Sequence, residues 1–285
     1  MKNAIEIKDL EKKYDKFELG KISLDIPSGL IVGLIGENGA GKTTLIKSIL
    51  NIIKINNGSI KIFDKDFHIQ ENKIKEDIGV VLDNTFFPEI LTPNDVNGIM
   101  KDIYKNWDQD LYFKYMKDFD LPFDKVIKSF SKGMRKKLEI ATALSHHPKL
   151  LILDEPTSGL DPVVRNEVLD IFMNFIQDEE HSILVSSHIT SDLEKIADYI
   201  VFIHEGKVLF SRPKDELTEQ YGIIKCNAKQ FDELNKNDII RYKKQDYEWQ
   251  VLVANRQKAK KEYPHTLVVP ASIDDIMLLY VKGEC

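Results

Sequence analysis

The sequence predicts an α/β fold in which helices cover a mostly parallel sheet. Three continuous apolar runs have the length of strands that are buried on both faces of such a sheet, and each run ends at glycine or at polar residues. Helical stretches separate the runs, which is the alternation typical of α/β proteins, whose ligands bind beyond the carboxyl ends of the strands. The runs are Leu30–Ile35, Leu150–Leu153 and Ser182–Ser186.

The first half of the chain predicts further strands, a helix and an inserted helical part. Ala4–Ile7 is strand-like, and Lys21–Ile26 alternates apolar and polar residues as a strand with one buried face does. Thr44–Ile53 is an apolar helical run. From about residue 64, aromatic and charged residues mix with helical periodicity. We therefore expect a helical subdomain over about residues 64–147.

The pattern of apolar and polar residues changes again near residue 218, and residues 218–285 predict a small α+β appendage. Tyr247–Val253 and Thr266–Val269 read as strands. Ser272–Tyr280 reads as an amphipathic helix, because its apolar residues recur at helical spacing. Ser272 and Asp275 form a cap-like start of that helix.

Composition restricts the functions open to the chain. Its 285 residues are 42% hydrophobic, so we expect a full-sized core. The net charge of −6 argues against a protein whose main role is to bind nucleic-acid phosphates. Two cysteines, Cys226 and Cys285, form no disulfide framework and indicate a reducing compartment. Nowhere do about 18 apolar residues run together, so we expect any membrane role to depend on a partner.

A glycine-rich loop after the first buried run predicts a phosphate-binding site. It matches the pattern G-x-x-x-x-G-K-[ST], whose backbone N–H groups surround phosphate oxygens at the positive end of a helix. Lys42 should reach the β- and γ-phosphates, and the Thr43 hydroxyl should ligate Mg²⁺. The loop consists of Gly36, Glu37, Asn38, Gly39, Ala40, Gly41, Lys42, Thr43 and Thr44.

Two carboxylates end the second buried run. Asp154 can hold Mg²⁺, usually through water, and Glu155 can polarise an attacking water molecule. Two acids after a strand also suit a helix N-cap or a solvated loop. Together with the phosphate loop, however, the pair predicts ATP hydrolysis.

These residues resemble the nucleotide-binding subunit of an ABC transporter over about residues 1–212, and we expect an ATP-binding domain over residues 1–217. Residues 36–43 resemble the Walker A loop, 150–155 Walker B, and 158–161 the D-loop. The resemblance implies a P-loop NTPase fold: a mixed or parallel core sheet, an antiparallel N-terminal β subdomain and an inserted helical subdomain. His188 is placed like the switch histidine, and Tyr14 like the aromatic residue that stacks on adenine.

The resemblance also implies a head-to-tail dimer in which ATP lies between one Walker A loop and the partner's signature. Residues 130–134 stand where that signature is found, and Ser131 and Gly133 are its matching residues. Ser131 can cap a helix over about residues 134–144 and donate to the γ-phosphate. Asp161 belongs to the D-loop. His188 would contact the γ-phosphate and hold the attacking water with Glu155.

The sequence departs from the family pattern in two places. Lys132 and Met134 stand where the signature usually has glycine and glutamine. Asp83, followed by Asn84, stands where glutamine usually senses Mg²⁺ and the membrane partner. We expect Asp83 to be linked to the metal and to catalysis, with a loop cap as the alternative. For the basic residues at 135–137 a solvated helix face is the favoured interpretation.

Both departures, and the tail from residue 270, resemble exporter ATPases that work with ABC-2-like membrane subunits, among them exporters of bacterial peptide toxins and antimicrobial peptides. We therefore expect an ATP- and Mg²⁺-dependent motor on the cytoplasmic face of the cell membrane. Its partners would be a separate ABC-2-like permease and a second ATPase chain, identical or related. A soluble ABC ATPase of the iron–sulfur assembly type is the alternative, and a non-hydrolysing regulatory subunit is disfavoured by Glu155 and His188.

Overall fold

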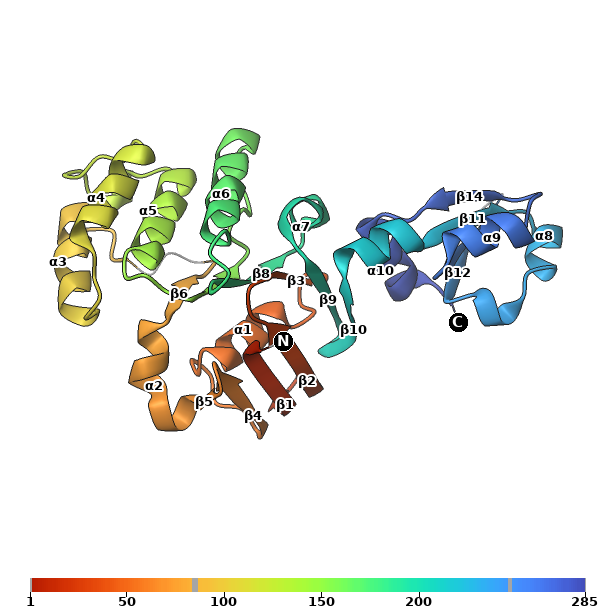
Figure 1. The fold of residues 1–285 in the computed structure, drawn as a ribbon, viewed down its shortest axis with the longest axis horizontal. Helices are drawn as coiled ribbons and strands as arrows, with labels where there is room; N and C mark the ends of the chain where they lie inside the picture. Colours follow the sequence, from red (N-terminus) through yellow and green to blue (C-terminus); the bar gives the residue numbers. More distant parts are fainter. Residues whose placement is uncertain (1, 84–86, 246–247, 285) are drawn as a thin grey trace.

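The computed structural model describes residues 2–83, 87–245 and 248–284. The molecule is elongated: a helical part lies at one end, two sheets lie in the middle, and a smaller α+β part lies at the other end (Figure 1). The strands are β1 (Asn3–Lys13), β2 (Glu18–Pro27), β3 (Ile31–Ile35), β4 (Asn57–Ile62), β5 (Lys65–Asp66), β6 (Ile78–Val81), β7 (Leu150–Asp154), β8 (Ser182–Ser187), β9 (Tyr199–His204), β10 (Lys207–Pro213), β11 (Gly222–Cys226), β12 (Arg241–Lys244), β13 (Trp249–Val253) and β14 (Leu267–Pro270). The α-helices are α1 (Lys42–Ile49), α2 (Phe67–Glu76), α3 (Pro93–Ile103), α4 (Gln109–Asp118), α5 (Lys132–Leu144), α6 (Pro162–Phe175), α7 (Thr190–Ile196), α8 (Ala228–Asp232), α9 (Arg256–Glu262) and α10 (Ile273–Lys282).

The central sheet has six strands in the order β10-β9-β3-β8-β7-β6. Every pair from β9 to β6 is parallel, and β10 returns antiparallel beside β9. The three predicted apolar runs are its neighbouring strands β3, β8 and β7, and all their residues are buried. The α/β prediction is confirmed. Because these strands are parallel, their carboxyl ends meet at one edge of the sheet.

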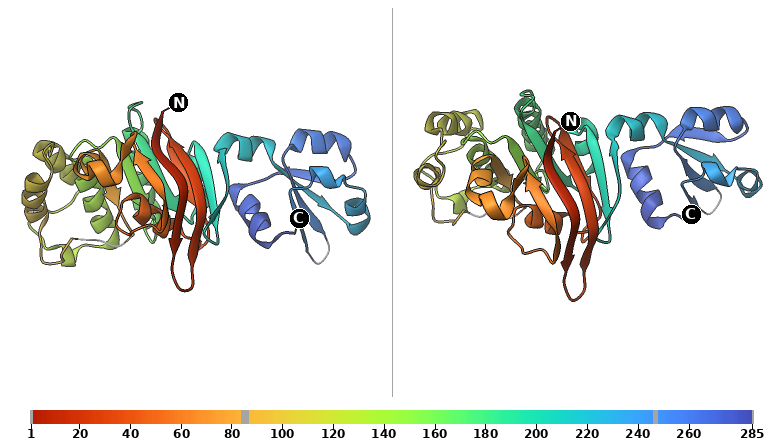
Figure 2. Two further views of the ribbon diagram at one scale, coloured as in Figure 1. Left: turned by 90° about the horizontal axis from the view of Figure 1, so that it is seen from below. Right: turned by 60° about the horizontal axis from the view of Figure 1, so that its bottom comes forward.

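A second, antiparallel sheet has the order β2-β1-β4-β5. Its long β1–β2 hairpin is seen edge-on in Figure 2. In β2, Ile22, Leu24 and Ile26 are buried and alternate with exposed residues, which is the pattern of a sheet with one solvated face. The predicted strands Ala4–Ile7 and Lys21–Ile26 are β1 and β2, and both extend beyond the predicted segments. The helix predicted at Thr44–Ile53 is α1, which begins and ends earlier.

The helical part consists of α3, α4 and α5 packed around Val96, Tyr112, Met116 and Leu138. A capping box at Thr92 begins α3. The predicted helical region, residues 64–147, also contains β6. That strand lies at the edge of the central sheet rather than in the helical part, because its apolar residues pair with β7.

The C-terminal part has the order β11-α8-β12-β13-α9-β14, with an antiparallel sheet ordered β12-β13-β11-β14. This is the ferredoxin-like arrangement. Neighbouring residues of β11 point to opposite faces: Ile224 packs in the cluster of Val251, Ala259 and Val268, whereas Ile223 packs toward the core of the central sheet. The predicted α+β composition is confirmed. Of the predicted Tyr247–Val253 strand, Tyr247 lies outside the described residues.

The last helix, α10, covers the other face of this sheet and joins it to the central core. Ile273, Ile276 and Leu279 belong to the same buried cluster as Ile196 and Phe202. Ser272 and Asp275 form the predicted capping box. Within the described ranges, no helix combines the length and the apolar character needed to cross a membrane.

Candidate active site

A pocket of about 670 Å³ lies at the carboxyl edge of the central sheet. The loop after β3 forms one wall, and residues that follow β6, β7 and β8 form the other. Most residues predicted for the phosphate loop and for hydrolysis therefore lie around one cavity. Its lining residues are Phe17, Glu37, Asn38, Gly39, Gly41, Lys42, Thr43, Thr44, Asp83, Glu155, Ser158 and His188.

The shape of the loop explains its first and last glycines. A Cβ atom on Gly36 would lie 2.3 Å from the carbonyl oxygen of Ile203. Gly41 has φ +111, and its Cβ would lie 2.8 Å from Phe17 and from Leu19. Gly41 is also the N-cap of α1, and no side chain of the described residues caps that end. The first N–H groups of α1 can therefore bind an anion.

Lys42 supplies the positive charge of this pocket. Its side chain is buried, and Nζ donates to the carbonyl oxygens of Gly36 at 2.8 Å and Glu37 at 3.4 Å. Nζ also lies 3.3 Å from Oε1 of Glu155. The ammonium group is thus held between the loop and the carboxylate, where charge-assisted bonds to phosphate oxygens can form.

Glu155 is held in a specific conformation at the end of β7. Its φ of 50 is uncommon for a residue other than glycine. The backbone N–H of Glu155 donates to the carbonyl and hydroxyl oxygens of Ser186 on β8, at 3.2 and 3.1 Å. The hydroxyl of Ser186 in turn donates to Oδ1 of the buried Asp154 at 2.5 Å. These bonds fix the backbone of Glu155 and the carboxylate of Asp154 relative to the two strands.

The Glu155 carboxylate holds His188. Oε2 accepts from Nδ1 of His188 at 2.7 Å and from its backbone N–H at 3.3 Å. Because an ionised carboxylate only accepts, Nδ1 of His188 carries a proton. Glu155 is 12% exposed and His188 is 41% exposed. The pair can orient a water molecule and take a proton from it beside the phosphate loop.

The oxygen atoms nearby suit Mg²⁺. The Thr43 hydroxyl and the Asp83 carboxylate belong to pocket-lining residues, and Asp154 ends the adjoining strand. In the part of the chain that the structure describes, no group of three or more His, Cys, Asp or Glu side chains could hold a metal ion by itself. A metal here would thus need substrate and water oxygens as well, which is how Mg²⁺ commonly binds at phosphates.

The remaining predicted residues lie outside this pocket. Ser131 is the N-cap of α5, and its hydroxyl accepts from the backbone N–H of Met134 at 3.2 Å. Asp161 is the N-cap of α6 and accepts from two N–H groups. A Cβ on Gly133 would lie 3.3 Å from Val164, so the first turns of α5 and α6 pack together. None of the three lines the pocket of its own chain.

The aromatic residue that lines the pocket is Phe17 rather than Tyr14. Tyr14 is 48% exposed and its ring lies 4.9 Å from Nζ of Lys12. Its N–H donates to the carbonyl oxygen of Phe17 at 2.8 Å, so the two residues stand at the ends of a tight turn. Counting residues back from the phosphate loop leads to this turn, and the stacking of Tyr14 on adenine stays a prediction. Ser158 was also missed as a lining residue.

The basic run on α5 differs from its favoured interpretation. Lys136 is only 3% exposed, and its Nζ donates to the carbonyl oxygen of Leu82 at 2.7 Å and to Oε2 of Glu139 at 2.8 Å. The prediction of a solvated side chain was wrong for Lys136, because the carbonyl just past β6 lies in the interior and needs a donor. Lys136 thereby holds the residue that precedes Asp83.

Known proteins are similar to this chain in sequence and in fold. Residues 19–158 match the ABC transporter family. The bacitracin transport ATP-binding protein BcrA of Bacillus licheniformis is 35% identical over 224 residues, which cover 77% of this chain and 73% of that protein. The lantibiotic transport ATP-binding protein SrtF of Streptococcus pyogenes is 34% identical over 213 residues, covering 74% of this chain and 91% of SrtF. A solved ATP-binding subunit of an ABC transporter has a TM-score of 0.68 at 28% identity, covering 75% of this chain and 91% of its own.

Proposed function

Because this chain belongs to the ABC transporter family as an ATP-binding subunit, we propose that it is the motor of an exporter whose membrane subunit is a separate chain. The observation that carries this proposal is the convergence of Lys42, Glu155 and His188 on one pocket above a phosphate loop. Residues 1–217 would form the ATP-binding domain, in which the helical subdomain predicted at about 64–147 is reduced to the part that contains α3, α4 and α5, and residues 218–285 would form an accessory domain.

The geometry supports a direct hydrolysis mechanism. The phosphates of ATP lie over the N-terminus of α1, where Lys42 moves from Glu155 to the β- and γ-phosphate oxygens and neutralises their charge. Glu155, now relieved of that ion pair, orients the attacking water and takes its proton. The water oxygen bonds to the γ-phosphorus, the bond to the β-phosphate oxygen breaks, and ADP and phosphate leave. His188 holds Glu155 through Nδ1 and faces the γ-phosphate.

Mg²⁺ would be held by Thr43 directly, by Asp154 through water, and by Asp83. When bound, it offsets charge on the phosphate oxygens. The sequence leaves two alternative roles open for Asp83, a metal-linked role and that of a loop cap. Replacing Asp83 with Ala should raise the Mg²⁺ concentration for half-maximal ATPase rate in the first case, whereas an unchanged titration would leave Asp83 a loop residue.

The partner that completes the site would be a second ATPase chain, identical or related, and we propose a second copy of this chain arranged head to tail. Ser131 and Asp161 are exposed and lie outside their own pocket, where they can meet the nucleotide of the other copy. The N-terminus of α5 would then direct its positive end at the same γ-phosphate. One chain carries both halves of the site, so two copies would form two complete sites.

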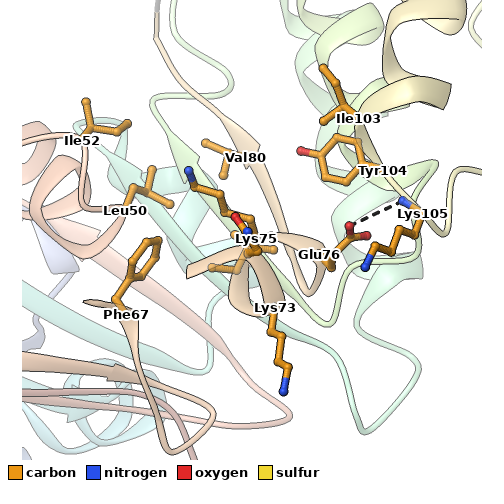
Figure 3. A pocket seen from close by; sticks show the side chains of 12 residues that line it. Leu50, Ile52, Phe67, Lys73, Lys75, Glu76, Val80, Ile103, Tyr104 and Lys105 are labelled. Atoms are coloured by element: carbon orange, nitrogen blue, oxygen red, sulfur yellow. Dashed lines mark hydrogen bonds between the residues drawn. The ribbon is translucent and has the colours of Figure 1, made fainter. Parts of the chain in front are cut away.

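A separate apolar groove is the proposed contact with the membrane subunit. It has a volume of about 640 Å³ and lies between the core and the helical part. Figure 3 shows Leu50 and Phe67 on one side, Ile103 and Tyr104 on the other, and Val80 of β6 between them. Ile52 and Ile103, which line the same groove, are 55% and 59% exposed, and adjoining exposed apolar residues of this kind mark interaction sites. Since β6 leads directly to Asp83, one strand links this groove to the nucleotide pocket.

The charges around the groove define its occupant. Lys73, Lys75 and Lys105 line it with one acid, Glu76, whose Oε2 has no hydrogen-bond partner among the described residues. An amphipathic cytoplasmic segment of the permease, with an apolar face and acidic residues beside it, would complement this surface. The names of BcrA and SrtF, a bacitracin and a lantibiotic transport ATP-binding protein, support a peptide cargo, whereas the ABC-2-like type of the permease rests on the sequence resemblance. This chain would then work on the cytoplasmic face of the membrane.

Purification of the tagged protein from detergent-solubilised membranes of its native cells tests this contact. We expect a multi-spanning membrane protein, identified by mass spectrometry, to accompany the chain and to be lost with Ile103→Asp. Ile69→Asp is the matched control, because Ile69 is 79% exposed on α2 but does not line the groove. Recovery of a soluble iron–sulfur scaffold instead would support the soluble alternative.

Phosphate release from ATP tests the catalytic assignment. Glu155→Gln keeps the shape of the side chain but removes the charge that activates water. We expect nucleotide affinity to persist and turnover to fall by about 10²–10⁴-fold. Glu180→Gln is the control, because Glu180 is an exposed surface residue. Wild-type turnover in Glu155→Gln would contradict the assignment.

A further inference from the structure

The helix that follows His188 is shared by two domains. α7 begins at Thr190, two residues after His188, and its apolar side chains Leu193 and Ile196 are buried in one cluster with α10 of the C-terminal part. A segment that carries a catalytic residue is therefore packed against an accessory domain. Packing alone does not identify the contacts by which the accessory domain would position this segment.

Two hydrogen bonds join α10 to α7. The hydroxyl of Thr190, which is 6% exposed, donates to Oδ1 of Asp274 at 2.7 Å. The backbone N–H of Ile273, the first residue of α10, donates to Oε1 of Glu194 at 3.0 Å. The C-terminal domain thus binds the first turn of α7 through Asp274, and Glu194 of α7 binds the first turn of α10. The negative charge of Glu194 is also favourable at the N-terminus of α10.

The opposite side of α7 holds the loop after Glu155. Asp192, which is 4% exposed, accepts from the hydroxyl of Thr157 at 2.6 Å and forms an ion pair with Arg165 on α6. Thr157 lies two residues after Glu155. α7 therefore contacts the catalytic segment on one side and the C-terminal domain on the other.

We infer that the C-terminal domain positions His188, and that Asp274 is the positioning residue that acts through Thr190. This inference rests on the catalytic role proposed for His188 above. The bond to Asp274 fixes the first turn of α7, and with it the direction in which His188 leaves β8 toward Glu155. Without that bond, the histidine ring would sample orientations in which Nδ1 no longer meets Oε2. The nucleotide would still bind, because Lys42 and α1 are not involved.

Steady-state ATPase kinetics of four full-length variants test this inference. Asp274→Ala and Thr190→Val should each lower kcat about two- to tenfold, the factor to which one hydrogen bond corresponds, with KM and ATP affinity unchanged. Asp274→Asn keeps an acceptor oxygen and should retain most of the rate. Asp275→Ala is the matched control, because it breaks the capping box of the same helix without a bond to α7. It should lower the melting temperature but not kcat.

A double variant separates positioning from a structural effect. In a His188→Ala background, Asp274→Ala should cause no further loss of kcat, since the residue that it positions is absent. The inference is overturned if Asp274→Ala leaves kcat unchanged, if Asp275→Ala lowers it equally, or if the losses of His188→Ala and Asp274→Ala multiply. A wild-type rate in His188→Ala itself would overturn both the proposed role of His188 and this inference. A slow His188→Ala beside a normal Asp274→Ala would overturn the inference alone.

Discussion

Replacing Lys136 with methionine should destabilise the helical part of the protein strongly. The Lys136 and Glu139 side chains are 4% and 8% exposed, and their ion pair is 2.8 Å long. Oε1 of Glu139 already has no hydrogen-bond partner among the described residues, and the Leu82 carbonyl would lose its donor as well. Removing one partner of a buried ion pair costs about 3–5 kcal/mol, because the other charge stays buried and uncompensated.

Urea unfolding followed by tryptophan fluorescence measures this cost. The chain has two tryptophans, and Trp249→Phe leaves only Trp107, which lies in the helical part. In that background Lys136→Met should lose about 3–5 kcal/mol of unfolding free energy, and adding Glu139→Gln should restore part of it. Lys137→Met is the control on the same helix: Lys137 is 15% exposed but its partner Glu167 is 49% exposed, so water can solvate the acid that is left unpaired and the loss should be smaller. Equal losses for the two lysine variants would refute the reasoning.

Three further predictions concern the nucleotide and the buried thiol. Phe17→Ala should weaken ATP binding by about 1–3 kcal/mol, which is the contribution of other aromatic–base stacks, whereas Tyr14→Ala should not weaken it. The reverse order would restore Tyr14 to the site. Ser131→Arg should leave the nucleotide affinity of one chain intact while abolishing ATP-driven pairing, and a loss of that affinity would show that Ser131 acts within its own chain. Burial, with a smaller contribution from Glu248, raises the pKa of Cys226 to about 11, so at pH 8 its reactive thiolate is scarce. In a Cys285→Ser background the folded protein should resist thiol reagents at that pH and react on unfolding, and rapid labelling of the folded chain would contradict the burial of Cys226.

The nucleotide pocket was predictable because its residues follow strands whose burial the sequence shows directly. The runs that became β3, β7 and β8 have apolar centres, so only their order in the sheet was needed to bring Lys42, Glu155 and His188 together. The capping box at Ser272 was predictable for a similar reason, since its two polar residues are three positions apart and precede an apolar periodic run.

The remaining features depend on contacts between segments far apart in the chain. Lys136 reads as one of several basic residues on a helix, and only the position of the Leu82 carbonyl, 54 residues earlier, makes it a buried donor. Phe17 and Tyr14 are both aromatic residues of one turn, and the turn geometry decides which of them faces the pocket. The strand β6 was included in a helical region because it is short and its partner β7 is distant in sequence.

The central claim is that two copies of this chain enclose ATP between them and hydrolyse it there. Light scattering of the purified Glu155→Gln variant tests it most directly, because slow hydrolysis should let ATP accumulate in the pair. With ATP and Mg²⁺ we expect a particle of twice the mass of one 32.9 kDa chain, and with ADP the mass of a single chain. A single-chain mass with bound ATP, at protein concentrations well above those used for the kinetics, would contradict the claim.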